Sequence, residues 1–162
     1  QNPYNGTWAR DAFPVPVVHK DGKISLVGAK YFRSFDGNSG IANAINFKIQ
    51  QYAFTFVGGN ILADENGTCF IVNSTRRFNS TEADYTSAYG CKGVRLMKHI
   101  NGIGDIDEVI KPIGQKTILT NTPEYVQDLQ SWGYKVILLP VAKTPSYPNQ
   151  TYANSLILNG TV

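Results

Sequence analysis

The 162-residue sequence is poor in charge and has no long apolar run. Charged residues make up 17% of the chain and the net charge is +3, with no run of lysines or arginines that would follow a phosphate backbone. The longest apolar stretch, residues 136–142, is far shorter than the roughly 18–20 residues that a membrane helix needs. We therefore expect neither a nucleic-acid partner nor a membrane span.

Histidine is also scarce, which argues against most metal sites. His19 and His99 are the only histidines, 80 residues apart, and no Cys/His cluster has the spacing of a zinc site. Gly102-Ile103-Gly104 lacks the rest of a dinucleotide-binding fingerprint. We expect no metal and no cofactor.

Cys69 and Cys91 are the only cysteines, and the sequence leaves two interpretations of the pair open. In an exported protein they would form a disulfide closing a loop of about 22 residues, worth on the order of 3 kcal/mol in the chain-entropy model. In a reducing compartment they would be two buried thiols. The sequence gives no distance between the side chains, so it does not choose.

Six Asn-x-Ser/Thr sequons favour an exported, glycosylated protein over the alternative of a merely polar surface. They lie at Asn5, Asn66, Asn73, Asn79, Asn149 and Asn159. The chain begins at Gln1, and its first residues lack the charged start and apolar centre of a signal peptide, so we expect that any such peptide has been removed. The expected location is extracellular.

A repeated layout is the most informative feature of the sequence. Four segments each open with Asp or Asn, continue as an apolar strand, pass through a glycine-containing turn and resume as a second strand. The openings are Asp11, Asn60, Asp105 and Asn154, which are 49, 45 and 49 residues apart. This period is typical of propeller-like arrays of small sheets.

The four hairpin turns are marked by glycine. The first two are expected at Asp21-Gly22 and Asn66-Gly67, and the third around 112–114, with the strand before it starting at Asp105. The fourth is expected at Asn159-Gly160, two residues before the last residue given, so we expect something outside this sequence to complete that sheet.

Helices are expected between the hairpins, so that each repeat has the order strand, strand, helix, strand. The best signal has Thr122 as the cap and Gly133 as the stop, followed by a strand over 134–142. Apolar residues at helical spacing predict a second helix over 42–53, and a third is expected near 81–89.

The order of several short motifs resembles the guanidino-group-modifying superfamily, the penteins. The motifs are Trp8-Ala9-Arg10-Asp11, Gly58-Gly59-Asn60 with Asp64 and Gly67-Thr68, Gly104-Asp105-Ile106-Asp107, and residues 152–160. That family includes agmatine deiminases and bacterial-type peptidyl-arginine deiminases, and its fold is a five-module ββαβ propeller with the active site in a central channel. The resemblance implies an α+β fold for residues 1–162, as one incomplete propeller domain of about four modules.

The resemblance also implies roles for individual residues. Two carboxylates of the family bind a guanidinium, whose planar donors suit bidentate oxygen acceptors, and these match Asp11 and Asp107. Asn60 and Asp105 would line the same acidic channel. The family's general acid/base histidine stands two residues before the second carboxylate, where this sequence has Asp105, and its nucleophilic cysteine comes later than Val162.

Alternatives stay open for these assignments. The four repeat openings stand at strand starts and turns, where Asp and Asn commonly bond to the backbone. A second register places His99-Ile100-Asn101 on the family's His-x-Asp; it loses the carboxylate and breaks the repeat spacing, so we favour Asp105 and Asp107. Neither Cys69 nor Cys91 falls where the family places its nucleophile.

Two functional hypotheses follow. In the first, the chain is a fragment or processed chain of a secreted guanidino-group hydrolase, with the cysteine-bearing module on another chain. In the second, it is a catalytically inactive extracellular glycoprotein that uses the fold for binding or for self-association through its exposed strand edge. Asp105 in place of histidine favours the second, because it removes the proton shuttle. The remaining alternative is an unrelated exported β-rich domain.

Overall fold

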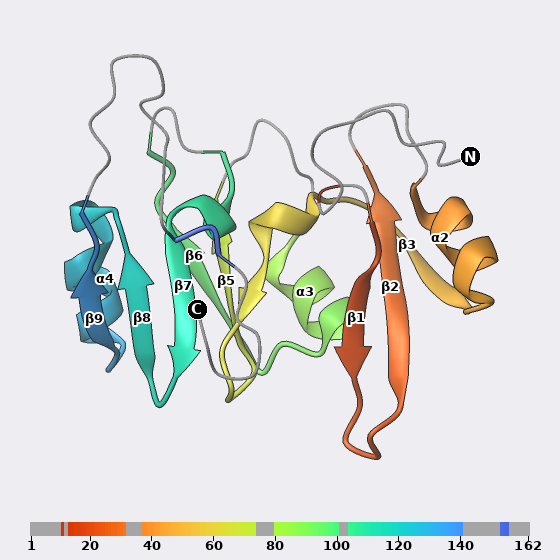
Figure 1. The fold of residues 1–162 in the computed structure, drawn as a ribbon, viewed down its shortest axis with the longest axis horizontal. Helices are drawn as coiled ribbons and strands as arrows, with labels where there is room; N and C mark the ends of the chain where they lie inside the picture. Colours follow the sequence, from red (N-terminus) through yellow and green to blue (C-terminus); the bar gives the residue numbers. More distant parts are fainter. Residues whose placement is uncertain are drawn as a thin grey trace. The chain divides into compact units, whose positions relative to one another are not determined.

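The computed structural model describes residues 11, 13–31, 37–73, 80–100, 104–140 and 153–155. These residues form three separate three-stranded sheets, drawn with their helices in Figure 1, and none of the three closes on itself. The chain divides into two compact units: Gln1–Gly59 with Ser74–Val94, and Asn60–Asn73 with Arg95–Val162.

The first sheet lies in the first unit. Its strands are β1 (Val15–Val18), β2 (Ile24–Lys30) and β3 (Ile49–Thr55). β1 and β2 form an antiparallel hairpin around the predicted Asp21-Gly22 turn, where Gly22 has a φ of +79°. The helix α2 (Gly37–Ile45) then connects β2 to β3, which pairs parallel to β2.

The helix predicted over 42–53 is wrong for every residue after Ile45. α2 ends at Ile45, Asn46 adopts a left-handed φ of +51°, and the Phe47 N–H donates to the Ala42 carbonyl at 3.1 Å. This is the six-to-one bond of a Schellman motif, which stops a helix. The apolar residues after it continue at a spacing that suits a helix, but they form β3.

The second sheet follows the same connection order. Its strands are β4 (Leu62–Ala63), β5 (Thr68–Val72) and β6 (Gly93–Met97), in that spatial order. β4 and β5 are antiparallel around the predicted Asn66-Gly67 turn. Between β5 and β6 the chain forms α3 (Glu82–Tyr89), which confirms the helix predicted near 81–89. Thr81 caps it reciprocally with Asp84, and Gly90 ends it with a φ of +69°.

An aromatic cluster joins α3 to the end of β3 within the first unit. Phe54 and Phe56 contact Tyr85 and Tyr89, with ring centroids 5.0–6.4 Å apart. Pairs at these distances contribute beyond the area they bury. Burial raises the pKa of Tyr85 and of Tyr89 above the usual value, so both phenols stay neutral at physiological pH.

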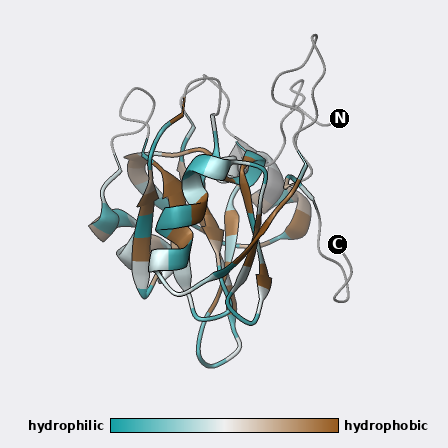
Figure 2. Ribbon diagram, turned by 90° about the vertical axis from the view of Figure 1, so that its left-hand side faces the viewer, coloured by the Kyte–Doolittle hydropathy of each residue, from teal (hydrophilic) through white to brown (hydrophobic). Residues whose placement is uncertain are grey.

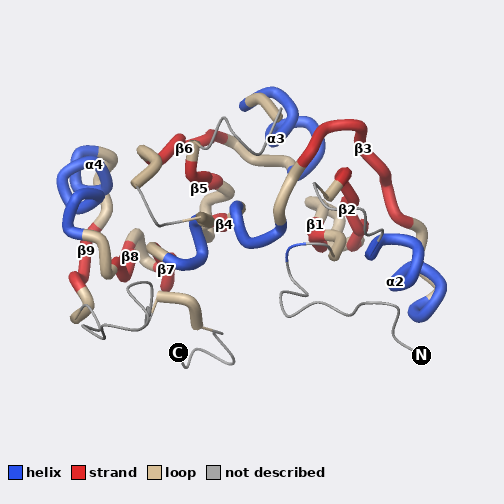
Figure 3. The backbone as a smooth tube through the Cα atoms, turned by 90° about the horizontal axis from the view of Figure 1, so that it is seen from above, coloured by secondary structure: helices blue, strands red, loops and turns tan. Residues whose placement is uncertain are grey.

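The third sheet lies in the second unit. Its strands are β7 (Ile110–Gly114), β8 (Thr117–Thr120) and β9 (Lys135–Leu138). β7 and β8 are antiparallel and β9 pairs parallel to β8. The crossover consists of the 3-10 turn η3 (Pro123–Tyr125) and α4 (Val126–Ser131), which confirms the helix predicted between Thr122 and Gly133. The predicted cap is wrong in its side chain, because the Thr122 hydroxyl donates to Asn121 Oδ1 and makes no capping bond. Figure 3 shows α4 beside β9.

The third hairpin turn was predicted a few residues too early. The strand expected from Asp105 begins as the 3-10 turn η2 (Ile106–Glu108), and the hairpin turns at Gln115 and Lys116 instead of 112–114. Pro112, taken as a turn residue, lies within β7. A proline is tolerated there because β7 is an edge strand of its sheet.

Buried side chains of β5, β6, η2, β7, β8 and α4 form the core of the second unit, and Figure 2 shows apolar residues along the strands with hydrophilic ones at the turns. The buried members are Phe70, Val72, Met97, Ile106, Val109, Ile110, Ile118, Tyr125, Leu129 and Tyr134. Trp132 packs against this cluster, and the Arg95 guanidinium lies 5.1 Å from its ring centroid.

The structure thus has the predicted α+β class. The predicted strand, strand, helix, strand order occurs three times among the described residues. Of the fourth repeat the structure describes only Ala153–Ser155, whose Ser155 carbonyl accepts from Lys111 Nζ. The predicted turn at Asn159-Gly160 lies outside the described residues, so a count of four modules stays a prediction. Among the described residues, every helix is too short or too polar to cross a membrane.

The β7–β8 turn generates a prediction about stability. Gln115 and Lys116 both have φ near +50°, as a type I′ turn requires, although neither is a residue that tolerates this region well. Replacing them by Asn and Gly should raise the free energy of unfolding by about 1 kcal/mol, seen as a higher urea midpoint at unchanged slope. The bond from the Lys116 N–H to Glu65 Oε1, 2.9 Å, is kept.

Gly114→Ala is the control of opposite sign. Gly114 has a φ of +92°, and a Cβ added there meets nothing within 4 Å, so the change tests backbone strain alone. We expect it to lower stability by about 1 kcal/mol. A lower midpoint for the Asn-Gly variant would refute the strain argument.

Candidate functional site

Asp11, the first predicted guanidinium carboxylate, belongs to the first unit. It is half-buried, and its Oδ1 accepts from the Gly59 N–H at 3.3 Å. Gly59 lies in the 3-10 turn η1 (Gly58–Asn60), which follows β3 and the buried residues Phe56 and Val57. The carboxylate is therefore held at a turn that the apolar core of the unit fixes in place.

Asn60 belongs to the second unit, is 1% exposed and is bonded entirely to backbone groups. Its Nδ2 donates to the Val72 carbonyl at 3.0 Å, and its Oδ1 accepts from the Val72 N–H at 2.9 Å. The same oxygen accepts from the Ile106 N–H at 3.2 Å. One buried amide thus joins the end of β5 to the start of η2.

This arrangement is the backbone-bonding role that the sequence left open for Asn60. Both lone pairs of Oδ1 are engaged, since a carbonyl oxygen offers two. The contact that the structure shows is structural: Asn60 sets the position of η2. The predicted contact of Asn60 with a ligand stays a prediction.

Residues 105–108, which comprise η2 and the residue before it, carry three half-buried acidic residues. Glu108 turns back onto the segment, where its Oε2 accepts from the N–H groups of Gly104 at 3.0 Å and Asp105 at 3.4 Å. Asp105 is the residue that precedes the turn, in extended conformation. Asp107 stands between two anchored residues, since Ile106 is completely buried on one side and Glu108 is bonded on the other.

Asp64, a residue of the family motif, serves the β4–β5 hairpin. Its Oδ1 accepts from the N–H groups of Asn66 at 2.9 Å and Thr68 at 2.8 Å, and its Oδ2 accepts from the Tyr134 hydroxyl at 2.7 Å. Burial alone would raise the pKa of Asp64, but the bonds from Tyr134, Thr68 and Asn66 outweigh it and hold the pKa below its usual value. The pKa of Tyr134 is raised to about 12, mainly because the phenol is buried and secondly because it donates a hydrogen bond to the Asp64 carboxylate.

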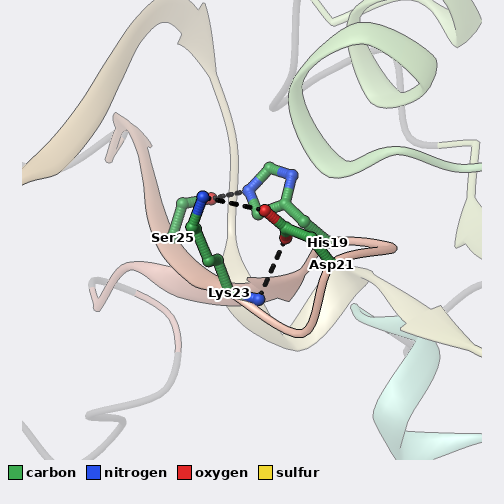
Figure 4. A network of polar contacts seen from close by, with 4 residues as sticks. All are labelled: His19, Asp21, Lys23 and Ser25. Atoms are coloured by element: carbon green, nitrogen blue, oxygen red, sulfur yellow. Dashed lines mark hydrogen bonds and ion pairs between the residues drawn. The ribbon is translucent and has the colours of Figure 1, made fainter.

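A Ser, a His and an Asp also meet at the β1–β2 hairpin, drawn in Figure 4. His19 Nε2 lies 2.9 Å from Ser25 Oγ. Asp21, however, bonds to Lys23, through the Lys23 N–H at 3.1 Å and Nζ at 3.0 Å, and this lysine lowers the pKa of Asp21. A triad needs its carboxylate to orient the histidine, so these contacts stabilise the hairpin instead.

The remaining predicted residues fall in different places. Cys69 and Cys91 are both disulfide-bonded, so neither offers a thiolate. His99 is exposed, and Asn101 of the alternative register lies outside the described residues. Asn154 is exposed. Within the described ranges, no group of three or more His, Cys, Asp or Glu side chains is arranged to hold a metal ion.

Two sequons can be placed. Asn66 is exposed in the β4–β5 turn and Asn73 is exposed just after β5. The sequons at the other positions, Asn5, Asn79, Asn149 and Asn159, lie outside the described residues.

No pattern in the sequence pointed to Tyr134, whose hydroxyl donates to Asp64 Oδ2 from 70 residues away. A tyrosine between a helix stop and a strand is ordinary, and only proximity in space reveals its partner. Tyr125 of η3 is also buried, and its hydroxyl donates to the Lys98 carbonyl at 2.6 Å.

Removing the Asn60 amide should destabilise the protein strongly. Asn60→Ala leaves the Val72 N–H, the Val72 carbonyl and the Ile106 N–H buried without their partner, at about 1–3 kcal/mol for each group. We expect a loss of at least about 3 kcal/mol in urea unfolding. Asn154→Ala, at an exposed asparagine, should change stability by less than about 0.5 kcal/mol. Equal effects of the two changes would contradict the role assigned to Asn60.

The Tyr134 hydroxyl should control acid stability. Because the folded-state pKa of Asp64 is lowered, its stabilisation is present above the unfolded pKa of about 4 and is lost as pH falls through the folded value. Tyr134→Phe should flatten this loss in urea unfolding measured from neutral pH to about pH 2. Tyr125→Phe, whose hydroxyl bonds a carbonyl, should lower stability without flattening it. Identical pH profiles for the two variants would rule out the Asp64 contribution.

Solved structures match the chain, whereas no protein-family model and no curated protein does. A C. jejuni agmatine deiminase with substrate bound is 20% identical with a TM-score of 0.78, covering 95% of this chain and 58% of its own. The Enterococcus faecalis agmatine deiminase is 16% identical with a TM-score of 0.65, covering 82% and 49%. DDAH from Pseudomonas aeruginosa, complexed with citrulline, is 13% identical with a TM-score of 0.55, covering 82% and 52%.

The matched proteins are longer than this chain. The chain spans little more than half of the C. jejuni enzyme. The TM-scores of 0.55–0.78 establish the fold, whereas identities of 20% and below leave the activity open. Agmatine deiminases and DDAH are penteins, and the motif order predicted their fold. The chain has the fold of the guanidino-group-modifying, or pentein, superfamily.

Proposed function

We propose that the chain is the guanidinium-binding portion of a secreted guanidino-group hydrolase of the deiminase type. The observation that carries the proposal is the placement of Asp107: in a fold shared with agmatine deiminases, it lies on a turn anchored by the buried Asn60 amide. Asp107 is half-buried, so the residue is partly accessible from solvent. The resemblance assigns the role of first guanidinium carboxylate to Asp11 and that of second to Asp107.

The chemistry of a carboxylate suits this role. A guanidinium presents parallel N–H donors, and a carboxylate accepts two of them at once. A turn that is fixed in advance avoids the entropy cost of ordering a flexible loop around the ligand. Asp107 has such a turn, since Ile106 and Glu108 hold it on either side.

Asp11 and Asp107 would bind the guanidinium but would not act as the nucleophile. Deiminase chemistry needs a thiolate, and the two cysteines of this chain are disulfide-bonded. The proposal therefore gives these 162 residues binding and orientation, and gives the attack on the guanidinium carbon to a cysteine-bearing module on another chain or a further segment.

A second candidate function is binding without catalysis, as an inactive extracellular glycoprotein. The disulfide-bonded cysteines and the carboxylic acid at Asp105 favour it, because a carboxylate replaces the imidazole as a proton shuttle poorly near neutral pH. Hydrolysis of agmatine or a peptidyl arginine by the longest natural product of the gene separates the two candidates: turnover supports the hydrolase, and binding without turnover supports the second.

Calorimetric titration of this chain at low salt tests the binding step. Agmatine and an arginine-containing peptide should bind, whereas putrescine, which has amines in place of the guanidinium, should bind at least about tenfold more weakly. Asp107→Asn and Asp11→Asn should each cost about tenfold in affinity, or about 1.4 kcal/mol.

Asp128→Asn is the matched control, since Asp128 is an exposed carboxylate on α4, and it should leave affinity unchanged. Equal affinities of the Asp107 and Asp128 variants, or no difference between agmatine and putrescine, would eliminate the guanidinium site.

A further inference from the structure

The turn between β4 and β5 places an Asn-x-Thr sequence on the surface. Asn66 is exposed, and Gly67 and Thr68 complete the sequon on half-buried positions. The Gly67 N–H donates to the Asp64 carbonyl at 3.0 Å, and Gly67 has a φ of +83° that favours glycine. The sequon therefore occupies a tight hairpin turn.

The backbone of this turn is fixed by the protein itself. Asp64 Oδ1 accepts from both the Asn66 and the Thr68 N–H groups, and Glu65 Oε1 accepts from the Lys116 N–H at 2.9 Å. Because these bonds use backbone N–H groups and Asn66 is exposed, a group attached to the Asn66 side chain leaves them intact. The folded turn thus has room for a bulky hydrophilic modification.

The cysteines give an independent indication of the compartment. Cys69 follows Thr68 directly, and both Cys69 and Cys91 are disulfide-bonded. Structural disulfides form in the oxidising secretory compartments and are rare in the cytosol. N-linked glycosylation of Asn-x-Ser/Thr belongs to secreted proteins as well.

We propose that Asn66 is an N-glycosylation site and carries an N-linked oligosaccharide. Nδ2 of Asn66 attacks the anomeric carbon of a lipid diphosphate-linked oligosaccharide; the new C–N bond forms as the C–O bond to the diphosphate breaks. Nδ2 loses one proton, and the lipid diphosphate leaves with the bonding electrons. This site is independent of the guanidinium-binding proposal.

A glycan on Asn66 would lie next to the β7–β8 turn. The bond between Glu65 and Lys116 brings the β4–β5 turn beside the β7–β8 turn. An oligosaccharide on Asn66 shields both turns from proteases and from association with other chains. Any self-association of the protein therefore uses surfaces away from these two turns.

The test is secretion of the full chain from a eukaryotic host, followed by enzymatic deglycosylation in heavy-oxygen water and peptide mass spectrometry. Deglycosylation converts a glycosylated Asn66 to a labelled Asp, so we expect the label at Asn66 in most molecules. Thr68→Ala removes the hydroxyl of the sequon and should abolish the label at Asn66, whereas Thr68→Ser should retain it.

Asn154→Gln is the matched control, because Asn154 is exposed but stands in no sequon, and it should leave the glycan mass unchanged. A label at any of the other five sequons shows that the host's oligosaccharyltransferase glycosylated the chain. A secreted, disulfide-bonded chain with an unlabelled Asn66 overturns the proposal, whether the other sequons are labelled or not. Persistence of the Asn66 label in Thr68→Ala would overturn it too.

Discussion

The buried amide of Asn60 is the constraint on which the acidic turn of the second unit depends. It pairs with Val72, 12 residues away, and with Ile106, 46 residues away, using one side chain that water barely reaches. Buried polar groups are costly when unpaired, so each partner holds the others in register. The direction in which η2 leaves the core, and with it the position of Asp107, follows from these bonds.

Local chemistry made much of the fold predictable. Asp21-Gly22 and Asn66-Gly67 specify tight turns, and Pro123 and Gly133 bracket a helical segment, because these residues act through their own backbone conformation. The failures arose where two local readings competed. The run after Ile45 has helical spacing but follows a left-handed Asn46, and Asp105 opens a 3-10 turn before its strand.

The candidate site was less predictable because its contacts are long-range. The sequence identified Asp107 and Asp11 only through the order of motifs, and it left Asn60 between a ligand-binding and a backbone-bonding role. Tyr134 had no signal, since the pattern around it fits an ordinary strand start while its partner Asp64 is 70 residues away. Periodicity and capping signals describe neighbours along the chain, whereas a hydrogen bond across a core depends on the finished packing.

Trp132 is an optical probe on the core of the second unit. It is one of two tryptophans in the sequence, and among the described residues it is alone, packed on the core of that unit beneath the Arg95 guanidinium. The first unit instead holds a cluster of tyrosine and phenylalanine rings around Tyr89. Replacing Trp8 by Phe would leave Trp132 as the sole indole, so that fluorescence would follow the second unit, and comparing it with the far-ultraviolet dichroism of the whole chain during unfolding would distinguish a concerted transition from a stepwise one.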